Sequence, residues 1–522
     1  MGLLRQSLQR YTLKKSPEDV IAQSRDPTKS LKKTLGALDL VILGVGAIIG
    51  AGIFVLAGLG AVMAGPYIVW AFVLAGFVCA LAGLAYAELA STIPTSGSAY
   101  GYTYSSMGET AAWILGWALV LEYAVGSAAV AIGWSGNMTA LMRSLFGFEL
   151  PTWAAYSLTS GVEGGFINLP AMVVTLLITT ILVVSSKGSA RLTGVFVAIK
   201  IAALLFIIGV GLFFVSGENL GLAPPPVQPG AWYAVLGAVG PVVGAAAIIF
   251  FAYIGFDAVS TTAEETKNPK RDLPIGILGS LVICTLLYIL ASTVLVGMVP
   301  YTDFIAGNGV TTAQAQDRLT QPFGYAFETA GIAWAANFIR AGAIIGTGSV
   351  LMVLLLGGPR VFFALARDGL LPESWSKVHP KYGTPYRTTI GTGVAVALFA
   401  GFGTIGAAGA LTNIGTLFAF AMVCIGVVIL RYTKPDLERP FRVPLNIGRF
   451  PILAALGAAL CFGLMASLSR STIIEFFGWM GLGLMIYALY GIRKSKLFGH
   501  VGRTRQPLPD GQAEIVLEEV RG

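Results

Sequence analysis

The sequence predicts a polytopic α-helical membrane protein with twelve membrane spans. Hydrophobic residues make up 55% of the 522 residues and charged residues only 11%, whereas a soluble domain is about 25% charged. Apolar stretches of about 20 residues, long enough to cross a ~30 Å hydrocarbon core as a helix, recur along the chain. Glycine supplies 66 residues, which favours close helix packing in a membrane. This composition excludes a soluble enzyme.

Hydropathy places the spans in order along the chain. The expected spans cover residues 38–64, 66–90, 111–139, 166–184, 192–215, 240–262, 273–299, 332–356, 388–408, 411–430, 450–467 and 473–492. Their ends are expected to move by several residues, because hydropathy locates an apolar stretch better than its boundaries.

The distribution of basic residues predicts the orientation. With both termini in the cytoplasm, 29 of the 34 Lys and Arg residues lie on the cytoplasmic side and three, Arg143, Arg318 and Arg470, lie outside. Such a bias is typical of membrane proteins. The net charge of +8 therefore reflects topology and attraction to anionic lipid rather than nucleic-acid binding.

The chain divides into three segments. Residues 1–36 and 494–522 are polar and lack a sustained apolar period, so both are expected to be cytoplasmic segments, and residues 37–493 form the transmembrane domain. The first apolar run follows about 35 polar residues, unlike a cleaved signal peptide. The first span is therefore expected to remain in the protein.

Cysteine and histidine chemistry is not expected. The four cysteines lie inside apolar runs without the spacing of a metal site or a disulfide framework: Cys79, Cys284, Cys424 and Cys461. The two histidines, His379 and His500, lie in polar connections, so a zinc or hydrolytic site inside the membrane has no ligands. No metal and no cofactor are expected.

Glycines interrupt the first span. Residues 44–54 read Gly-Val-Gly-Ala-Ile-Ile-Gly-Ala-Gly-Ile-Phe, although each glycine inside a helix costs roughly 1 kcal/mol relative to alanine. Gly46 and Gly50 alone form the GxxxG pair of close helix packing. Because helix packing needs only that pair and Gly52 is an additional glycine, we expect these glycines to bind a ligand through their backbone amides rather than to serve packing. Gly50→Val or Gly52→Val is then expected to abolish binding while the fold is retained.

The sixth span contains a second interruption. Residues 250–257 read Phe-Phe-Ala-Tyr-Ile-Gly-Phe-Asp, with a glycine and a carboxylate at a comparable depth. Two interrupted helices five spans apart predict an inverted-repeat transporter that binds its substrate at the midplane. Free amides of the first break suit an anionic group, and free carbonyls of both breaks suit a cation. A zwitterion such as an α-amino acid satisfies both.

Specific motifs spread over residues 35–492 indicate a family. They are residues 44–54, 94–100, 116–117, 121–123, 197–200, 250–259, 264–269, 366–369 and 411–417, the last reading Leu-Thr-Asn-Ile-Gly-Thr-Leu. In these motifs the chain resembles the amino acid–polyamine–organocation superfamily, and closely resembles bacterial members of its cationic amino acid transporter family.

The resemblance implies a LeuT-type fold, in which spans 1–5 and 6–10 form inverted repeats and two further spans follow. It also implies that the protein imports amino acids by alternating access. The membrane is then a plasma membrane, expected to be a bacterial inner membrane. In the family, backbone amides of the first break bind the substrate carboxylate, and here these are the amides of Gly50, Ala51 and Gly52. Backbone carbonyls of both breaks bind the substrate ammonium, and here these belong to Ala47, Ile48, Phe251 and Ile254. Ala51 replaces the Ser or Thr of some relatives, so one hydroxyl contact to the carboxylate is missing.

Three ionisable residues inside the spans are functional candidates, because an unpaired charge in lipid is costly. Lys200 lies nine residues from Arg191, hence ~13 Å deep. The resemblance places it where sodium-coupled relatives bind a cation, so a proton-coupling role is expected in preference to a snorkelling lysine. Glu122 is either a satisfied buried carboxylate or a residue of the pocket or the proton path. Asp257 is expected to cap the second half-helix, with substrate or proton handling as the alternative.

Three further charges lie near the span ends. Arg340 is expected to be an interfacial residue. Asp39 and Glu88, at the cytoplasmic ends of the first two spans, belong either to networks with basic loop residues or to the interface. The residues alone do not separate these two alternatives.

The leading prediction is a proton-driven amino acid importer. A sodium-independent exchanger of cationic amino acids is the alternative within the family. An ion channel is the alternative of another class, although the sequence carries no selectivity-filter signature. The apolar candidates for the pocket wall favour small or medium neutral amino acids, unless Glu122 reaches the pocket and admits Lys or Arg. The transport mode, the oligomeric state and any small accessory membrane subunit stay open.

Overall fold

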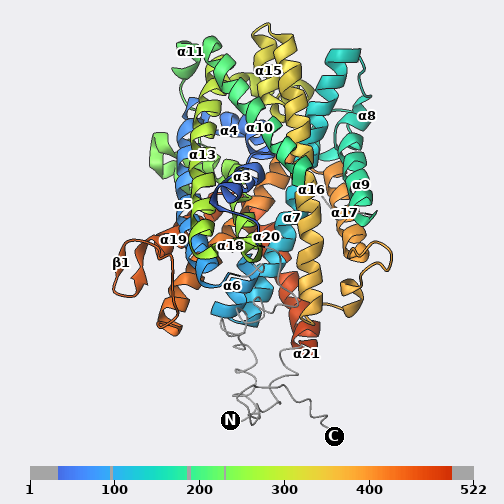
Figure 1. Ribbon diagram of the computed structural model, residues 1–522. Helices are drawn as coiled ribbons and strands as arrows, with labels where there is room; N and C mark the ends of the chain where they lie inside the picture. Colours follow the sequence, from blue (N-terminus) through green and yellow to red (C-terminus); the bar gives the residue numbers. More distant parts are fainter. Residues whose placement is uncertain (1–32, 95–97, 185–189, 228–230, 308, 496–522) are drawn as a thin grey trace, which may run out of the picture.

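The computed structural model describes residues 33–94, 98–184, 190–227, 231–307 and 309–495, and helices dominate them (Figure 1). Each predicted span coincides with a helical segment, which confirms the all-α membrane fold. Eight described stretches are long and apolar enough to cross a membrane, and the first, Ala37–Thr92, contains two predicted spans. Most of the two predicted cytoplasmic terminal segments lies outside the described residues.

The ten unbroken spans are single helices whose ends differ from the prediction by a few residues. They are α5 (Ile68–Thr92), α7 (Glu109–Phe146), α9 (Leu169–Val184), α10 (Ala190–Gly211), α13 (Pro269–Met298), α16 (Ala333–Arg367), α17 (Tyr386–Phe402), α18 (Ile405–Thr433), α19 (Ile452–Ala466) and α20 (Arg470–Ile486). Helix α16 extends well beyond residue 356, so Arg360 and Arg367, expected in a loop, are helical.

Short helical turns fill most connections. They are η2 (Gly65–Tyr67), α6 (Ser98–Ser106), α8 (Thr152–Ala155), η3 (Leu158–Ser160), η4 (Leu212–Phe214), α11 (Gly217–Leu220), η5 (Trp232–Val239), η8 (Tyr301–Phe304), α14 (Thr312–Thr320), α15 (Pro322–Thr329), η9 (Glu373–Ser376), the π-helical η10 (Tyr487–Gly491) and α21 (Ile492–Lys494). A small antiparallel hairpin precedes α19 and pairs β1 (Asn446–Ile447) with β2 (Phe450–Pro451).

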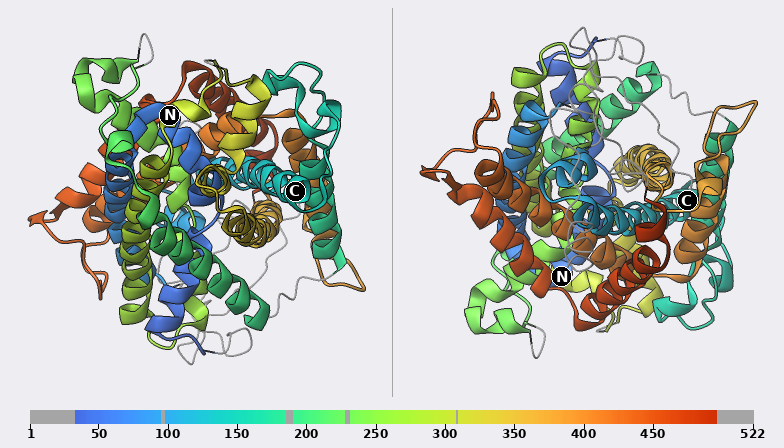
Figure 2. Two further views of the ribbon diagram at one scale, coloured as in Figure 1. Left: turned by 90° about the horizontal axis from the view of Figure 1, so that it is seen from above. Right: turned by 90° about the horizontal axis from the view of Figure 1, so that it is seen from below.

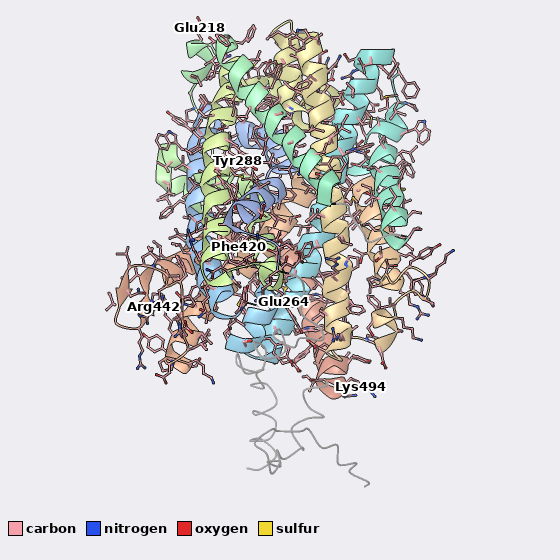
Figure 3. The ribbon with its side chains drawn as sticks, in the orientation of Figure 1. Glu218, Glu264, Tyr288, Phe420, Arg442 and Lys494 are labelled. Atoms are coloured by element: carbon pink, nitrogen blue, oxygen red, sulfur yellow. The ribbon has the colours of Figure 1, made fainter. Side chains whose placement is uncertain are left out.

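The predicted inside and outside loops lie at opposite ends of the molecule. Glu218, in a predicted outside loop, lies at one end, whereas Arg442 and Lys494, in predicted inside segments, lie toward the other (Figure 3). Between these ends, large apolar side chains such as Val173, Leu286 and Phe477 are exposed. An exposed apolar belt of this kind fits a lipid environment, where no water competes for the surface.

The helices form two packed groups joined by two further helices. One group contains α5, α13 and the two interrupted spans, and the other contains α7, α9, α16 and α17. Figure 2 views the helices nearly end-on, with the gold α16 beside the teal α7. Helix α10 contacts α13 and α16, and helix α18 contacts α5 and α7. The fifth helix of each repeat therefore bridges the two groups.

The first span is broken in its middle. Helix α3 (Ala37–Ile48) ends where Ile49 adopts an extended backbone, with φ −70° and ψ 110°. The chain resumes as a π-helical turn, η1 (Gly52–Leu56), and continues as α4 (Ala57–Ala64). This interruption leaves backbone groups at both new helix ends without partners in the ordinary helical ladder.

The sixth span is broken at the corresponding place. Helix α12 (Gly240–Ile249) continues as a 3-10 turn, η6 (Phe250–Tyr253), and Ile254 is extended with φ −62° and ψ 133°. Gly255 follows with φ +124°, a conformation that side chains strongly disfavour. The chain then resumes as the 3-10 helix η7 (Phe256–Glu265).

The two breaks pack directly against each other through glycines. A Cβ atom on Gly52 would overlap the backbone of Ala252 and lie 2.6 Å from its amide nitrogen. A Cβ atom on Gly255 would lie 2.7 Å from the carbonyl oxygen of Ala47. The expectation that valine at Gly50 or Gly52 leaves packing largely intact is therefore wrong. Both positions are crowded, since a Cβ on Gly50 would also meet a Val350 methyl at 2.7 Å.

Gly52→Ala should destabilise the protein, because the added methyl group meets a backbone rather than a movable side chain. We expect a loss of about 1–3 kcal/mol, the usual cost of overpacking. Gly478→Ala in α20 is the matched control, because nothing lies within 4 Å of its added Cβ and alanine favours a helix. Thermal unfolding in detergent, followed by tryptophan fluorescence, measures both. Equal unfolding midpoints would contradict the packing role of Gly52.

Candidate functional site

Lys200 reaches the first break from α10. Its side chain is only 3% exposed, and its Nζ donates a hydrogen bond of 2.8 Å to the carbonyl oxygen of Gly46. In a continuous α-helix this carbonyl would accept from the amide of Gly50, four residues on. Lys200 thus supplies a donor where the break occurs, and its ammonium faces the negative end of a half-helix. The snorkelling alternative is wrong, because the side chain is buried against α3.

Two residues that the sequence analysis did not single out also donate hydrogen bonds to backbone carbonyls near the breaks. Tyr288 of α13 donates from its hydroxyl to the carbonyl oxygen of Ile48 at 3.0 Å. Asn413 of α18 donates from Nδ2 to the carbonyl oxygens of Ala247 and Ile248 at 2.8 and 2.6 Å. A buried amide in an apolar span was a signal for Asn413. Tyrosine is too common in spans to have singled out Tyr288.

Asp257 lies in the first turn of η7 and binds the amide that precedes this helix, whose N-cap has no side-chain bond. Its Oδ1 accepts from the backbone amide of Gly255 at 3.2 Å, at the start of η7. The side chain is 9% exposed, so this amide is the kind of donor that a buried carboxylate needs. The contact explains the carboxylate structurally, and a role of Asp257 with substrate or protons stays a prediction.

Glu122 lies in the interior on α7, with 2% of its surface exposed. Its carboxyl group lies near Thr416 of α18 and interacts electrostatically with Asp257. The second oxygen, Oε2, has no hydrogen-bond partner among the described residues. The interpretation of Glu122 as a fully satisfied carboxylate is therefore wrong. A buried oxygen without a donor is costly and marks a place where a proton or a ligand is accommodated.

The structure brings the predicted binding positions of the two breaks together. Gly52 abuts Ala252 and Gly255 abuts Ala47, so the two breaks lie against each other. Ala47, Ile48, Gly50, Ala51 and Gly52 come from the first break, and Phe251 and Ile254 from the second. Their individual contacts with a substrate stay predictions.

Arg340 lies near the predicted outer end of α16, where its side chain is buried within the protein. It is 1% exposed and donates from Nε to Gln321 at 2.8 Å and from Nη1 to Asn337 at 3.1 Å. It also forms an ion pair with Glu328 of α15. Neighbouring residues thus satisfy the buried charge, and the network anchors α14 and α15 to α16 at the predicted outer end.

The charges at the opposite end have structural partners. Glu88 and Arg431 are each 2% exposed and form a bidentate ion pair, with a distance of 2.9 Å from Arg431 Nε to Glu88 Oε1. The amide of Val443 also donates to Glu88 at 2.7 Å, which fixes the segment before the hairpin. Glu88 therefore belongs to a network with basic residues. Asp39 instead accepts from the Gly36 amide at 2.9 Å and caps α3.

A separate polar cavity of about 290 Å³ opens at the predicted outer end. Its lining includes Ser135 and Arg143 of α7, Tyr156, Asn168, and Asp317 of α14. The Arg143–Asp317 ion pair of 2.9 Å lies at this cavity, and its side chains are 44% and 26% exposed. Neither break contributes to the lining, so this cavity is distinct from the region around Lys200.

Comparisons with known proteins agree with this geometry. The sequence pattern of the amino acid permease family matches residues 35–488. The chain is 43% identical to the branched-chain amino acid permease BcaP of Bacillus subtilis over 486 residues, which cover 93% of this chain and 98% of the relative. It is 42% identical to the methylthioribose transporter of the same organism, with the same coverage.

A plant relative extends the comparison. The vacuolar cationic amino acid transporter 4 of Arabidopsis thaliana is 38% identical over 425 residues, covering 81% of this chain and 67% of the relative. The family match over residues 35–488 includes both breaks and the bridging helices α10 and α18, and the relatives are transporters rather than enzymes. On this evidence the chain is a multi-pass membrane protein and an amino acid transporter, and it belongs to the amino acid permease family.

Proposed function

We propose that this protein imports amino acids by proton-coupled alternating access. The observation that carries the proposal is the hydrogen bond from the buried Lys200 ammonium to the Gly46 carbonyl oxygen. A buried ammonium at a helix break supplies a positive charge within the protein itself. The bias of 29 inside against 3 outside basic residues supports both termini in the cytoplasm of a bacterial cell, and an inward proton gradient would then drive import.

The substrate site lies at the facing breaks. The carboxylate binds the amides of Gly50, Ala51 and Gly52, because these amides begin a half-helix and carry its positive end. Lys200 supports this arrangement, since it occupies the carbonyl that the Gly50 amide would otherwise meet. Gly52 contributes only its amide, because its Cα faces Ala252.

The substrate ammonium binds carbonyls of both breaks, at Ala47, Ile48, Phe251 and Ile254. The Ile48 carbonyl already accepts from Tyr288, but a carbonyl oxygen has two lone pairs and can accept a second donor. Phe251 is buried and apolar, which suits a neutral side chain. The similarity to a branched-chain amino acid permease supports the same substrate class.

Alternating access follows from the two helix groups. The broken spans pack with α5 and α13, and the other group packs around α16. When one group rocks against the other around the breaks, the substrate becomes accessible from each side in turn. The proton reaches Lys200 in the same cycle, so that binding at the first break depends on the protonation state of the lysine.

Lys200→Ala should abolish accumulation driven by a pH gradient and weaken amino acid binding, because the Gly46 carbonyl loses its donor. Uptake of L-leucine and L-alanine into proteoliposomes, with inward proton and sodium gradients applied separately, measures the accumulation. The amino acid concentration that gives half-maximal uptake reports the change in binding. Lys270→Ala is the matched control, since this lysine is exposed and pairs with Glu438. Wild-type uptake that follows sodium and ignores pH would reject proton coupling.

A cationic substrate is the second candidate, and the unpartnered Oε2 of Glu122 favours it. A buried positive side chain needs a negative partner. If Glu122 serves that purpose, Glu122→Gln should weaken binding of L-lysine and L-arginine at least about tenfold more than binding of L-leucine. Isothermal titration of the purified protein with each amino acid measures this ratio. Equal losses for both classes assign Glu122 to proton handling or to structure instead.

A further inference from the structure

Both interrupted spans receive a side-chain donor at the same position. Gly46 lies two residues before the end of α3, and its carbonyl accepts from Lys200. Ala247 lies two residues before the end of α12, and its carbonyl accepts from Asn413. The donors come from α10 and α18, the fifth helix of each repeat. The two predicted repeats therefore share this hydrogen bond, from the fifth helix to a carbonyl near the end of the first half-helix.

The Asn413 amide is set up as a double donor. The side chain is fully buried, and Nδ2 donates its two hydrogens to the carbonyl oxygens of Ala247 and Ile248. The chemistry fixes the orientation of the amide, because the opposite orientation would set Oδ1 against two carbonyl oxygens. Oδ1 itself has no partner in the described part of the chain. Asn413 thus leaves one acceptor unsatisfied in order to serve two carbonyls.

These bonds compete with continuation of the helix. In an unbroken α12 the carbonyls of Ala247 and Ile248 would accept from the amides of Phe251 and Ala252, four residues on. The chain instead narrows to a 3-10 turn and then becomes extended at Ile254. Without Asn413, the amides of Phe251 and Ala252 are the nearest donors that could replace its side chain, through regular helical hydrogen bonds. Such bonds would change the 250–253 turn that leads into the extended Ile254 and Gly255.

We propose that Asn413 is a positioning residue that holds the second break open, as the neutral counterpart of Lys200 in the first repeat. It acts on the substrate through the 250–254 segment rather than by contact. The two repeats then differ in one chemical property, because the lysine can change its charge and the amide cannot. This inference rests on the proposed function, since the ligand is the transported amino acid.

Asn413→Asp tests the donor role with almost no change in shape. The ionised carboxylate cannot donate to a carbonyl, whereas its protonated form can donate one hydrogen. Equilibrium binding of L-leucine and L-alanine is measured from about pH 5 to pH 8 for the variant and the wild type. We expect the variant to bind at least about tenfold more weakly near pH 8 and to recover part of the loss on acidification.

Neighbouring titratable groups are handled by taking the ratio of variant to wild-type affinity at each pH. Glu122 on α7 and Asp257 on η7 interact near this turn of α18, and Tyr86 of α5 packs on Phe420 of α18. All three are present in both proteins. Their own pH dependence therefore largely cancels in the ratio.

Asn137→Asp is the matched control. Asn137 is also buried, and its Nδ2 also donates to two carbonyls, those of Gly133 and Thr320, at 3.0 and 2.9 Å. Its acceptors lie on α7 and at the end of α14 rather than on α12, so its substitution should lower stability without a pH-dependent loss of affinity. Asn413→Ser, with one neutral donor, should give a weaker affinity whose ratio to wild type is constant with pH.

Several outcomes would overturn the inference. Wild-type affinity of Asn413→Asp at every pH would reduce Asn413 to a packing residue, and an equal affinity loss in Asn137→Asp would indicate general destabilisation. If the aspartate variant does not fold, Asn413→Ser against Asn137→Ser decides, since only the first should lose affinity. A wild type that binds none of the common amino acids would instead reject the proposed function, and this inference with it.

Discussion

Backbone carbonyls without helical partners constrain the whole interior of this protein. Lipid cannot donate to them, so each needs a donor from the protein, from water in a cavity or from a bound substrate. Lys200, Tyr288 and Asn413 supply protein donors from three different helices. These side chains help the interrupted spans to exist inside the membrane. The positions of α10, α13 and α18 are therefore as much a part of the site as the breaks themselves.

Close contact between the breaks joins two distant parts of the chain into one unit. Gly52 meets the backbone of Ala252, and Gly255 meets the backbone of Ala47. Since backbone meets backbone at both contacts, neither break can shift without displacing the other. The donors Lys200 and Asn413, by contrast, stand on the two bridging helices. A motion of one helix group against the other would thus act on the substrate site through these two side chains.

Buried charges in this structure fall into two kinds. Glu88 pairs with Arg431, and Arg340 pairs with Glu328 and neighbouring amides. Breaking a pair that is buried on both sides, such as Glu88–Arg431, typically costs about 3–5 kcal/mol, because it leaves a buried charge alone. These pairs maintain the architecture at the two ends. Glu122 differs, because one of its oxygens lacks a donor. A missing partner, rather than burial alone, separates the functional candidate from the structural pairs.

The sequence by itself determined the spans, the two interruptions and the importance of Lys200, because hydropathy, glycine placement and the depth of a charge are local properties. It could not identify the Gly46 carbonyl as the partner of Lys200, the role of Asn413, or the ion pair of Glu88. These partners lie 154 to 343 residues apart along the chain. It also misjudged the packing at Gly52 and could not identify the partners of Arg340, for the same reason. Crowding and charge compensation depend on which distant segments approach, and only the tertiary structure decides that.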